Sequence, residues 1–327
     1  MVNRRYLVAG AGGFIGGHLV RSLLEKGDVD VVAVDCKPLN EWEQLFNGAT
    51  NVVADLREAD ACRNVVSDVS HVVNLAADMG GMGFIESHKA DCMLSVLINT
   101  NLLWAARDQD VERYFYASSA CVYNADRQSS PYATALKEED AYPADPEDGY
   151  GWEKLFSERM CRHFLEDYGV ETRVARFHNV YGPNGTWRGG REKAPAAICR
   201  KVAEAAERGG GEIVIWGDGQ QTRSFTYIDD CIDGIIRITD SEIRTPVNLG
   251  SSELVSIDEL VSIVEAIAGV ECKRQYDTSA PQGVRGRNSD NSYIFRQLNW
   301  EPRTSLKDGL LTTYSWIRQE LLGTADR

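Results

Sequence analysis

A glycine-rich turn between a strand-like run and a helix-like run constrains the fold of this chain more than any other feature. The stretch "VAGAGGFIGG" (8–17) follows an apolar β-like run and opens a helical pattern that continues to residue 27. Gly10, Gly13 and Gly16 recur at every third position within it. In such a unit the first glycine permits a tight turn, the second lets the backbone approach a pyrophosphate, and the third lets the helix pack closely on the strand. The spacing therefore predicts a dinucleotide-binding unit.

Strand-like and helix-like runs alternate through the first half of the chain. Regular alternation of this kind predicts an α/β fold, here a Rossmann-like doubly wound parallel sheet with helices on both faces. The strand-like runs are 5–10, 29–35, 70–77, 111–119 and 170–182, and the helix-like runs are 13–27, 93–109 and 150–169.

A segment rich in glycine and proline, residues 181–195, interrupts this alternation. We expect a dinucleotide-binding domain over 1–177, which the runs at about 227–249 complete by returning to the sheet. The remaining segments, 178–226 and 250–327, are expected to form a smaller C-terminal α/β domain that binds the substrate.

Composition restricts the partners of the chain. The net charge is −14, from 35 basic and 49 acidic residues, which argues against general binding to nucleic acid or to an anionic membrane. No apolar run is long enough to span a bilayer, and glycines break the apolar N-terminal stretch that would otherwise resemble a secretory signal. The eight cysteines form no CxxC pair and the five histidines are isolated, so we expect a cytoplasmic protein with reduced thiols and no metal.

Asp35 ends the second strand-like run, about twenty residues after the glycine turn. An acidic residue at this place hydrogen-bonds the ribose hydroxyls of NAD and repels the 2′-phosphate of NADP. Asp35 therefore favours NAD, and Lys37 is the nearby cation that works against this preference. The alternative interpretation is a solvated strand end. Asp55, in "VVADLR", is a second candidate, at the adenine end, and a strand-end turn explains it almost as well.

Tyr150 and Lys154 lie four residues apart at the start of a helical pattern, so both side chains share one face. A phenol with a pKa near ~10 is a poor base at neutral pH, and a neighbouring ammonium favours the phenolate. A phenolate at this place can take the proton of a substrate hydroxyl, and Ser119, at the end of the preceding strand-like run, can hydrogen-bond that hydroxyl. The residues expected to contact the dinucleotide are Gly10, Gly13, Phe14, Ile15, Gly16, Asp35, Asp55, Tyr150 and Lys154.

With these motifs in place, the chain resembles the extended short-chain dehydrogenases/reductases that act on nucleotide sugars, and among them the GDP-mannose 3,5-epimerase family. The resemblance extends over essentially the whole chain. The segments that carry it are "AADMGGMGFI" (76–85), "YASSACVY" (116–123), "RFHNVYGP" (176–183), "GGREKAPAA" (189–197), "WGDGQQTRSFT" (216–226) and "GVRGRNSDN" (283–291).

The resemblance implies an isomerase with bound NAD that converts GDP-D-mannose to GDP-L-galactose, and to GDP-L-gulose when only carbon 5 is inverted. Oxidation at carbon 4, with Tyr150 taking the hydroxyl proton, gives a transient 4-ketone that acidifies the neighbouring C–H bonds. The family implies Cys121 as the base and Lys193 as the acid that invert these centres. Cys121 follows a strand of the dinucleotide-binding domain and Lys193 lies between the domains, so a sugar in the cleft has room between them.

Three other functions remain open from the sequence. In nucleotide-sugar 4,6-dehydratases an Asp-Glu pair follows the strand-end Ser/Thr, where this chain has Ala120 and Cys121. A 4-epimerase needs no second acid/base pair and would leave Cys121 and Lys193 unused. A non-catalytic protein that senses NAD is the remaining possibility, although the complete set of Ser119, Tyr150 and Lys154 argues against it.

The diphosphate of the nucleotide sugar is expected to contact arginines, because one guanidinium group can donate two parallel hydrogen bonds to phosphate oxygens. Arg223 and Arg287 are the first candidates, with Arg285 a second choice. Two departures from the family pattern are Ser95, where an asparagine is expected, and the bulky Trp152. The resemblance also implies a homodimer. The residues expected to contact the GDP-sugar are Gly80, Gly81, Ser119, Ala120, Cys121, Asn179, Glu192, Lys193, Ala194, Lys201, Gln221, Thr222, Arg223 and Arg287.

Overall fold

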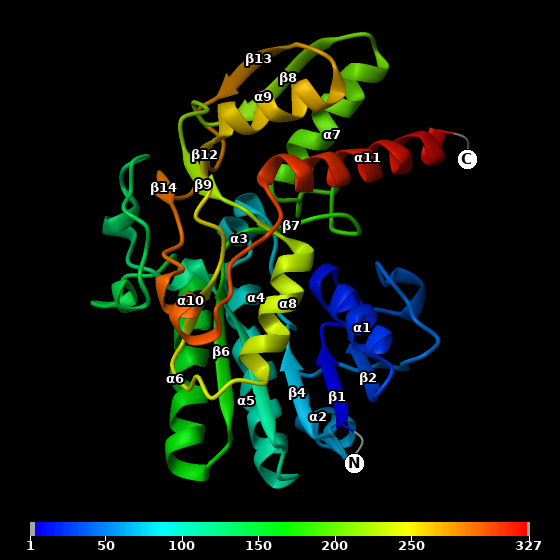
Figure 1. Cartoon of the computed structure of the whole chain (residues 1–327), viewed down its shortest axis with the longest axis vertical. Helices are drawn as coiled ribbons and strands as arrows, with labels where there is room; N and C mark the ends of the chain where they lie inside the picture. The colour runs from blue at the N-terminus through cyan, green and yellow to red at the C-terminus, as the bar shows by residue number, and fades with distance from the viewer. Residues whose placement is uncertain (1–3, 326–327) are drawn as a thin grey trace.

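The computed structural model describes residues 4–325, and a seven-stranded parallel sheet forms its centre (Figure 1). The strands are in the order β11-β6-β5-β4-β1-β2-β3. This arrangement confirms the predicted Rossmann-like doubly wound sheet. The strand bounds are β1 (Arg4–Ala9), β2 (Val29–Asp35), β3 (Thr50–Val53), β4 (His71–Asn74), β5 (Arg113–Ser119), β6 (Thr172–Phe177) and β11 (Val247–Leu249).

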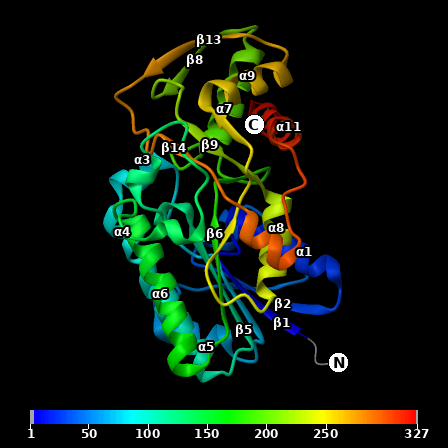
Figure 2. The same ribbon diagram turned by 60° about the vertical axis from the view of Figure 1, so that its left-hand side comes forward.

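Helices cover both faces of the sheet because its strands are apolar on both sides. In β1, Tyr6 and Val8 belong to one buried cluster while Leu7 and Ala9 belong to the other. Figure 2 shows one group of helices on each side of the strands. One face carries α1 (Phe14–Lys26) and α8 (Ile228–Thr239), and the other carries α2 (Ala59–Val66), α5 (Ser95–Asp108) and α6 (Tyr150–Tyr168).

The strand order reverses between β1 and β4, because the chain continues from β1 to β2 on one side and resumes with β4 on the other. In open α/β sheets ligands bind in the crevice outside the carboxyl ends of the strands at such a point. The glycine turn after β1, Asp35 at the end of β2 and Ser119 at the end of β5 all lie at this edge of the sheet.

A smaller unit stands above the carboxyl ends of the sheet, at the top of Figure 1. Its strands β8 (Gly211–Trp216) and β13 (Cys272–Asp277) pair in parallel, and β12 (Leu254–Ser256), β9 (Thr222–Ser224) and β14 (Gly286–Arg287) form a three-stranded sheet. Its helices are α7 (Ala194–Glu207), α9 (Ile257–Ala268) and α11 (Leu306–Ala325). The short helices α3 (Met82–Ser87), α4 (Lys89–Met93) and α10 (Ser292–Leu298) complete the fold. Within residues 4–325, no helix is long and apolar enough to cross a membrane.

The run at 170–182 was predicted as one strand, and this prediction is wrong. The strand β6 ends at Phe177, and Asn179 takes a left-handed conformation with φ 44°. The chain then forms β7 (Val180–Tyr181), which pairs with β10 (Thr226–Tyr227) in a separate two-stranded sheet. Asparagine tolerates this backbone region better than most residues, so the break occurs where the sequence permits it.

Candidate active site

The glycine turn lies against other backbone and leaves no room for side chains at its key positions. A Cβ atom on Gly16 would lie 2.1 Å from the Gly10 carbonyl oxygen, and one on Gly10 would lie 3.0 Å from the Ala76 nitrogen. Gly10 also has φ +82°, a conformation that favours glycine. Gly13 precedes α1 without a side-chain cap, so the first N–H groups of the helix remain available to an anion.

A cavity of about 750 Å³ opens at this turn. Gly10, Gly13, Phe14, Ile15 and Gly16, the residues predicted at the dinucleotide, all line it. The far end of the cavity reaches Lys193 and Ala196 at the start of α7, in the smaller unit. The cavity therefore connects the cofactor turn to the segment between the two units.

Asp35 is 9% exposed at the edge of this cavity. Its two carboxylate oxygens accept hydrogen bonds from the backbone nitrogens of Gly12 and Lys37, both at 3.0 Å. Each oxygen keeps a further lone pair, so the carboxylate can still accept bonds from ribose hydroxyls. The Lys37 ammonium is directed to the Gly12 carbonyl at 2.7 Å. The uncapped helix terminus and this fixed carboxylate fit the pyrophosphate and ribose of a dinucleotide.

Asp55 also lines the cavity, and it is paired with Arg57, which the sequence analysis did not select. The Arg57 Nη2 lies 2.6 Å from Asp55 Oδ2, and this hydrogen bond lowers the pKa of Asp55. The pair lies in the same turn, two residues apart, so the strand-end turn proposed as its alternative role is present in the structure.

Cys121 sits in a tight turn that follows β5. The Ser119 hydroxyl accepts a hydrogen bond from the Cys121 backbone nitrogen at 3.2 Å, which begins the 3-10 turn Ala120–Val122. The first turn of α6 packs directly on this turn, since a Cβ on Gly151 would lie 2.4 Å from the Cys121 carbonyl oxygen. Cys121 and Tyr150 consequently share one buried cluster. Met79 packs on that cluster and also lines the cavity.

Tyr150 and Lys154 lie on the buried face of α6. Lys154 Nζ is 5.5 Å from the centroid of the Tyr150 ring and 3.6 Å from Glu153 Oε2. Burial, followed by the charges of Cys121 and Glu153, raises the pKa of Tyr150 well above 10, while its hydrogen bond with Ser119 opposes this. Burial is the main cause of this raised pKa, and the expectation that Lys154 promotes the phenolate of Tyr150 stays a prediction.

Cys121 and Lys193 come from different units of the fold, and the two are close enough for the charge of Cys121 to act on the pKa of Lys193. Burial raises the pKa of Cys121 to about 11. Burial also lowers the pKa of Lys193, and the charge of Cys121 works in the opposite direction. Lys193 occupies the position before α7, so its side chain is carried on the segment that joins the two units. Burial therefore shifts the pKa values of both groups in the direction that disfavours their charged forms.

Arg287 was expected at the diphosphate, and the structure places it beside the thiol. Its Nη1 donates to the Cys121 sulfur at 3.5 Å and its Nε donates to Gln128 Oε1 at 2.6 Å. Its remaining nitrogen pairs with the carboxylate of Glu147. Arg223 lies in the same cluster, and its partners among the described residues are the backbone carbonyls of Thr222, Gln282 and Val284. Burial and the neighbouring Arg287 lower the pKa of Arg223 to about 10.

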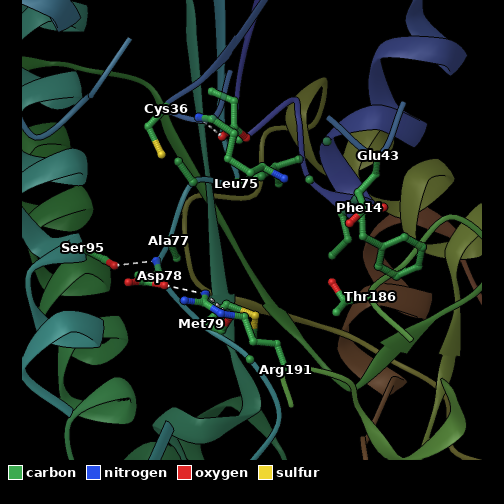
Figure 3. A pocket seen from close by; sticks show the side chains of 18 of the residues that line it. Phe14, Cys36, Glu43, Leu75, Ala77, Asp78, Met79, Ser95, Thr186 and Arg191 are labelled. Carbon is green, nitrogen blue, oxygen red and sulfur yellow. Dashed lines mark hydrogen bonds and ion pairs between the residues drawn. The ribbon is translucent and has the colours of Figure 1, made fainter. Parts of the chain in front are cut away.

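The glycines of "DMGG" approach the segment before Lys193. The backbone nitrogen of Gly81 donates to the Arg191 carbonyl at 3.0 Å, and a Cβ on Gly81 would lie 2.5 Å from the Glu192 carbonyl oxygen. Figure 3 shows Arg191 reaching the carboxylate of Asp78, at 2.7 Å. Gly80 lines the cavity. These contacts hold the Lys193 segment against the dinucleotide-binding unit.

Several predicted substrate residues have their polar atoms bound within the protein. The Asn179 amide donates to the Ser224 carbonyl, and Lys201 donates to the Val214 carbonyl at 2.6 Å. Glu192 pairs with Arg200. The others are Gln221, which donates to the Trp216 carbonyl, Thr222, which donates to the Pro131 carbonyl, and Arg285, which pairs with Asp218. Ala194 is the first residue of α7 and Ala120 is buried beside Ser119.

The two departures from the family pattern have structural explanations. The Ser95 hydroxyl accepts a hydrogen bond from the Asp78 backbone nitrogen at 3.0 Å, also seen in Figure 3, so it anchors the loop that meets Arg191. Asn99, one turn later in α5, is the buried asparagine of this helix and accepts a bond from the Tyr114 hydroxyl. Trp152 is 43% exposed, so its bulk points away from the buried Tyr150.

No cluster of residues suited to a metal ion occurs between positions 4 and 325. The residues near the site that sequence reasoning missed are Glu147, Gly151, Glu153, Arg57, Asp78 and Gln128. The glycine in "YGWEK" was a visible signal for close packing at Gly151. The carboxylates had no such signal, because nothing in the sequence sets them apart from surface residues.

Comparisons with known proteins agree with this geometry. A family model described as the NAD dependent epimerase/dehydratase family matches residues 6–250. GDP-mannose 3,5-epimerase 1 of Oryza sativa subsp. indica is 49% identical over 319 residues, which are 97% of this chain and 82% of that protein. GDP-mannose 3,5-epimerase of Arabidopsis thaliana is 47% identical over 323 residues, 98% of this chain and 83% of that protein. The structure of UDP-glucuronic acid 4-epimerase from Bacillus cereus, in complex with UDP-glucuronic acid and NAD, has a TM-score of 0.84 at 26% identity, covering 97% of this chain and 99% of that one.

Proposed function

The chain belongs to the NAD dependent epimerase/dehydratase family, and from this membership we propose that it is a GDP-mannose 3,5-epimerase, an isomerase that uses NAD. The resemblance seen in its motifs is confirmed. The observation that carries the proposal is the near-complete alignment with plant GDP-mannose 3,5-epimerases, which includes both the cofactor turn and the Lys193 segment. The substrate proposed is GDP-D-mannose and the products are GDP-L-galactose and, after inversion at carbon 5 alone, GDP-L-gulose.

The proposed cofactor residues are those of the glycine turn, with Asp35 on the ribose and Lys154 near the nicotinamide end. NAD, when bound, supplies reversible hydride transfer at carbon 4 of the hexose. Tyr150 takes the proton from the carbon 4 hydroxyl and Ser119 holds that hydroxyl by a hydrogen bond. Because burial raises the pKa of Tyr150, the phenolate needs nearby positive charge, and Lys154, 5.5 Å from the centre of the Tyr150 ring, is the residue we propose to offer it.

The 4-ketone acidifies the C–H bonds at carbons 3 and 5, and the proposed acid/base pair is Cys121 and Lys193. Transfer of the thiol proton to Lys193 breaks the S–H bond and forms an N–H bond, so base and acid arise together without net proton uptake. The attraction between thiolate and ammonium supports this transfer. The thiolate then removes a proton from one face of the sugar carbon, and the ammonium returns one to the other face. The ketone is reduced again at the end, so the net reaction is isomerisation.

We also propose a homodimer in the cytoplasm. The helices α5 and α6 pack side by side, and their outer surface exposes several large apolar side chains. A second copy of this surface would cover them by forming a bundle of four helices. The exposed apolar residues are Leu97 and Trp104 on α5 and Trp152 and Phe156 on α6, and Met93 and Leu94 lie just before α5. Cysteines without disulfides throughout positions 4–325 support a reducing compartment.

The test is incubation of the enzyme with GDP-mannose in D2O, followed by NMR of the sugar. Deuterium at carbons 3 and 5, with formation of the epimers, is the expected result. Incorporation at neither carbon refutes the proposal. An exchange of configuration at carbon 4 without solvent label would indicate a 4-epimerase, and loss of water from carbon 6 would indicate a 4,6-dehydratase.

A further inference from the structure

A buried charge cluster surrounds the sulfur of Cys121, and Arg287 is its centre. Arg287 is 4% exposed, and its guanidinium contacts the thiol, the side chain of Gln128 and the carboxylate of Glu147 at once. Glu147 lies 26 positions after the cysteine in the loop before α6, and its side chain is 11% exposed. A carboxylate next to Cys121 opposes formation of the thiolate, because the two negative charges repel each other. Its presence beside the proposed base needs a physical explanation.

Glu147 is held against Cys121 by both its backbone and its side chain. Its backbone nitrogen donates to the Cys121 carbonyl oxygen at 3.0 Å. One carboxylate oxygen pairs with Arg287, while Oε2 is buried without a hydrogen-bond partner among the described residues. A buried acceptor without a donor is costly, and the Cys121 thiol is a donor in reach of this carboxylate. The Glu147 carboxylate is therefore close enough to the thiol to act on its proton.

The charges around the thiol oppose one another. Burial raises the pKa of Cys121, Glu147 raises it further, and Arg287 with the Ser119 hydroxyl lowers it. Burial alone would raise the pKa of Glu147, but Arg287 holds it below its usual value, so the carboxylate stays charged. The titratable or charged groups that face Cys121 come from six elements or loops and are Cys92, Glu147, Tyr150, Lys193, Arg223 and Arg287. Glu147 is the carboxylate in this set.

We propose that Glu147 is a positioning residue for the reaction: it fixes Arg287 on the sulfur of Cys121 and keeps the thiol proton in place until the substrate is bound. Without it, the sulfur would face arginines and Lys193 with no negative charge to balance them, and the thiolate would form at lower pH. A thiolate that forms less readily is the stronger base, and removal of a carbon-bound proton benefits from that strength. This inference rests on the proposed function, since it presumes that Cys121 takes part in proton removal.

The test compares the wild-type enzyme with Glu147→Gln and Glu147→Asp, by measuring deuterium incorporation at carbons 3 and 5 as a function of pH. Glutamine keeps an acceptor for Arg287 but removes the charge, whereas aspartate keeps the charge. Activity of the wild type is expected to rise with pH as the Cys121–Lys193 pair loses its first proton. In Glu147→Gln this midpoint is expected to move about one pH unit lower or more, because a like charge near the thiol has been removed. At a pH well below both midpoints, a midpoint lower by one pH unit gives about ten-fold more of the reactive form, and the weaker thiolate base offsets part of this gain, so incorporation is expected to be faster than in the wild type by up to about ten-fold.

The direction in which the pH midpoint moves in Glu147→Gln separates a positioning role of Glu147 from a purely structural one. If Glu147 only supports the fold, Glu147→Gln lowers the rate at every pH and leaves the midpoint where it was, which overturns the inference. A variant too slow to measure is decided by titrating the ultraviolet absorbance of the thiolate, in each background with and without Cys121→Ala. If the wild type incorporates deuterium at neither carbon, the proposed function fails instead. Glu147→Asp is expected to keep the wild-type midpoint.

Discussion

Gly16 offers the sharpest structural test of the cofactor turn, through the single change Gly16→Ala. The added methyl group would lie 2.1 Å from the Gly10 carbonyl oxygen, 2.7 Å from the Gly10 carbonyl carbon and 2.8 Å from the Ala11 Cα. All three are backbone atoms, so no side chain can rotate away. Relief requires α1 to withdraw from the turn by about 1 Å, since carbon–oxygen contacts settle above about 3 Å.

Gly16→Ala is expected to lower both the stability of the fold and the affinity for NAD. Overpacking of this kind destabilises a protein by about 1–3 kcal/mol, which lowers the melting temperature by roughly 1–5 °C for a chain of this size. Withdrawal of the helix also removes at least one charge-assisted hydrogen bond to the pyrophosphate, about 1.5–3 kcal/mol. That loss corresponds to about 10- to 100-fold weaker binding of NAD.

The assay is calorimetric titration of NAD into protein freed of cofactor, with thermal unfolding measured in parallel. Gly17→Ala is the matched control, because it lies at the next position of the same helix and its Cβ would meet only side-chain atoms of Gln44. Alanine is favoured over glycine inside a helix by about 1 kcal/mol, so the control should be neutral or slightly stabilising and should bind NAD normally. Equal NAD affinity and equal melting temperature in the two variants would refute the argument.

Three further predictions concern chemistry, stability and assembly. Cys121→Ala should abolish deuterium incorporation at carbons 3 and 5 while NAD remains bound, and normal incorporation would show that the base is misassigned. His178 is buried with its pKa lowered by burial to about 3, so the unfolded chain takes up a proton below about pH 6.5 that the folded protein does not, and stability falls as pH falls. Chemical denaturation at pH 7 and pH 5.5 should therefore show a loss about 1 kcal/mol larger in the wild type than in His178→Gln, and equal losses would contradict the assignment. Phe156, 52% exposed on α6, should be essential to the dimer, so Phe156→Glu should halve the molar mass measured by light scattering with the circular dichroism unchanged.

The sequence predicted the features that depend on short stretches of chain. The glycine turn, Asp35 at the end of β2 and the buried helix face with Tyr150 and Lys154 each lie within a single unit of strand, turn and helix. Their geometry follows from the periodicity of apolar residues and from local backbone chemistry, so the local sequence pattern is sufficient to predict it. The prediction of a single strand over 170–182 failed because the apolar pattern continues across Asn179. The pattern does not show that Asn179 takes a left-handed conformation, after which the chain enters a second sheet.

The environment of Cys121 could not be predicted, because its partners are far away in the chain. Arg287 is 166 positions from the cysteine, and the two meet only after the smaller unit has folded over the sheet. Glu147 is closer in sequence, yet it lies in the acidic stretch "ADPEDGY", where a surface carboxylate is the natural interpretation. Only the folded backbone shows that this one is turned inward and paired with an arginine.

Charge balance in this cluster distinguishes the two arginines that the sequence treated alike. The positive charge of Arg287 is matched by Glu147, so this guanidinium is committed to the thiol. Arg223 has only backbone carbonyls as hydrogen-bond partners, and burial together with Arg287 lowers its pKa to about 10. Arg223 is partly exposed and makes no ion pair within positions 4–325, so its guanidinium is free to bind an anionic diphosphate. Arg223 is therefore the arginine we propose for the diphosphate, and substrate binding would then add negative charge to a cluster in which Glu147 balances only Arg287.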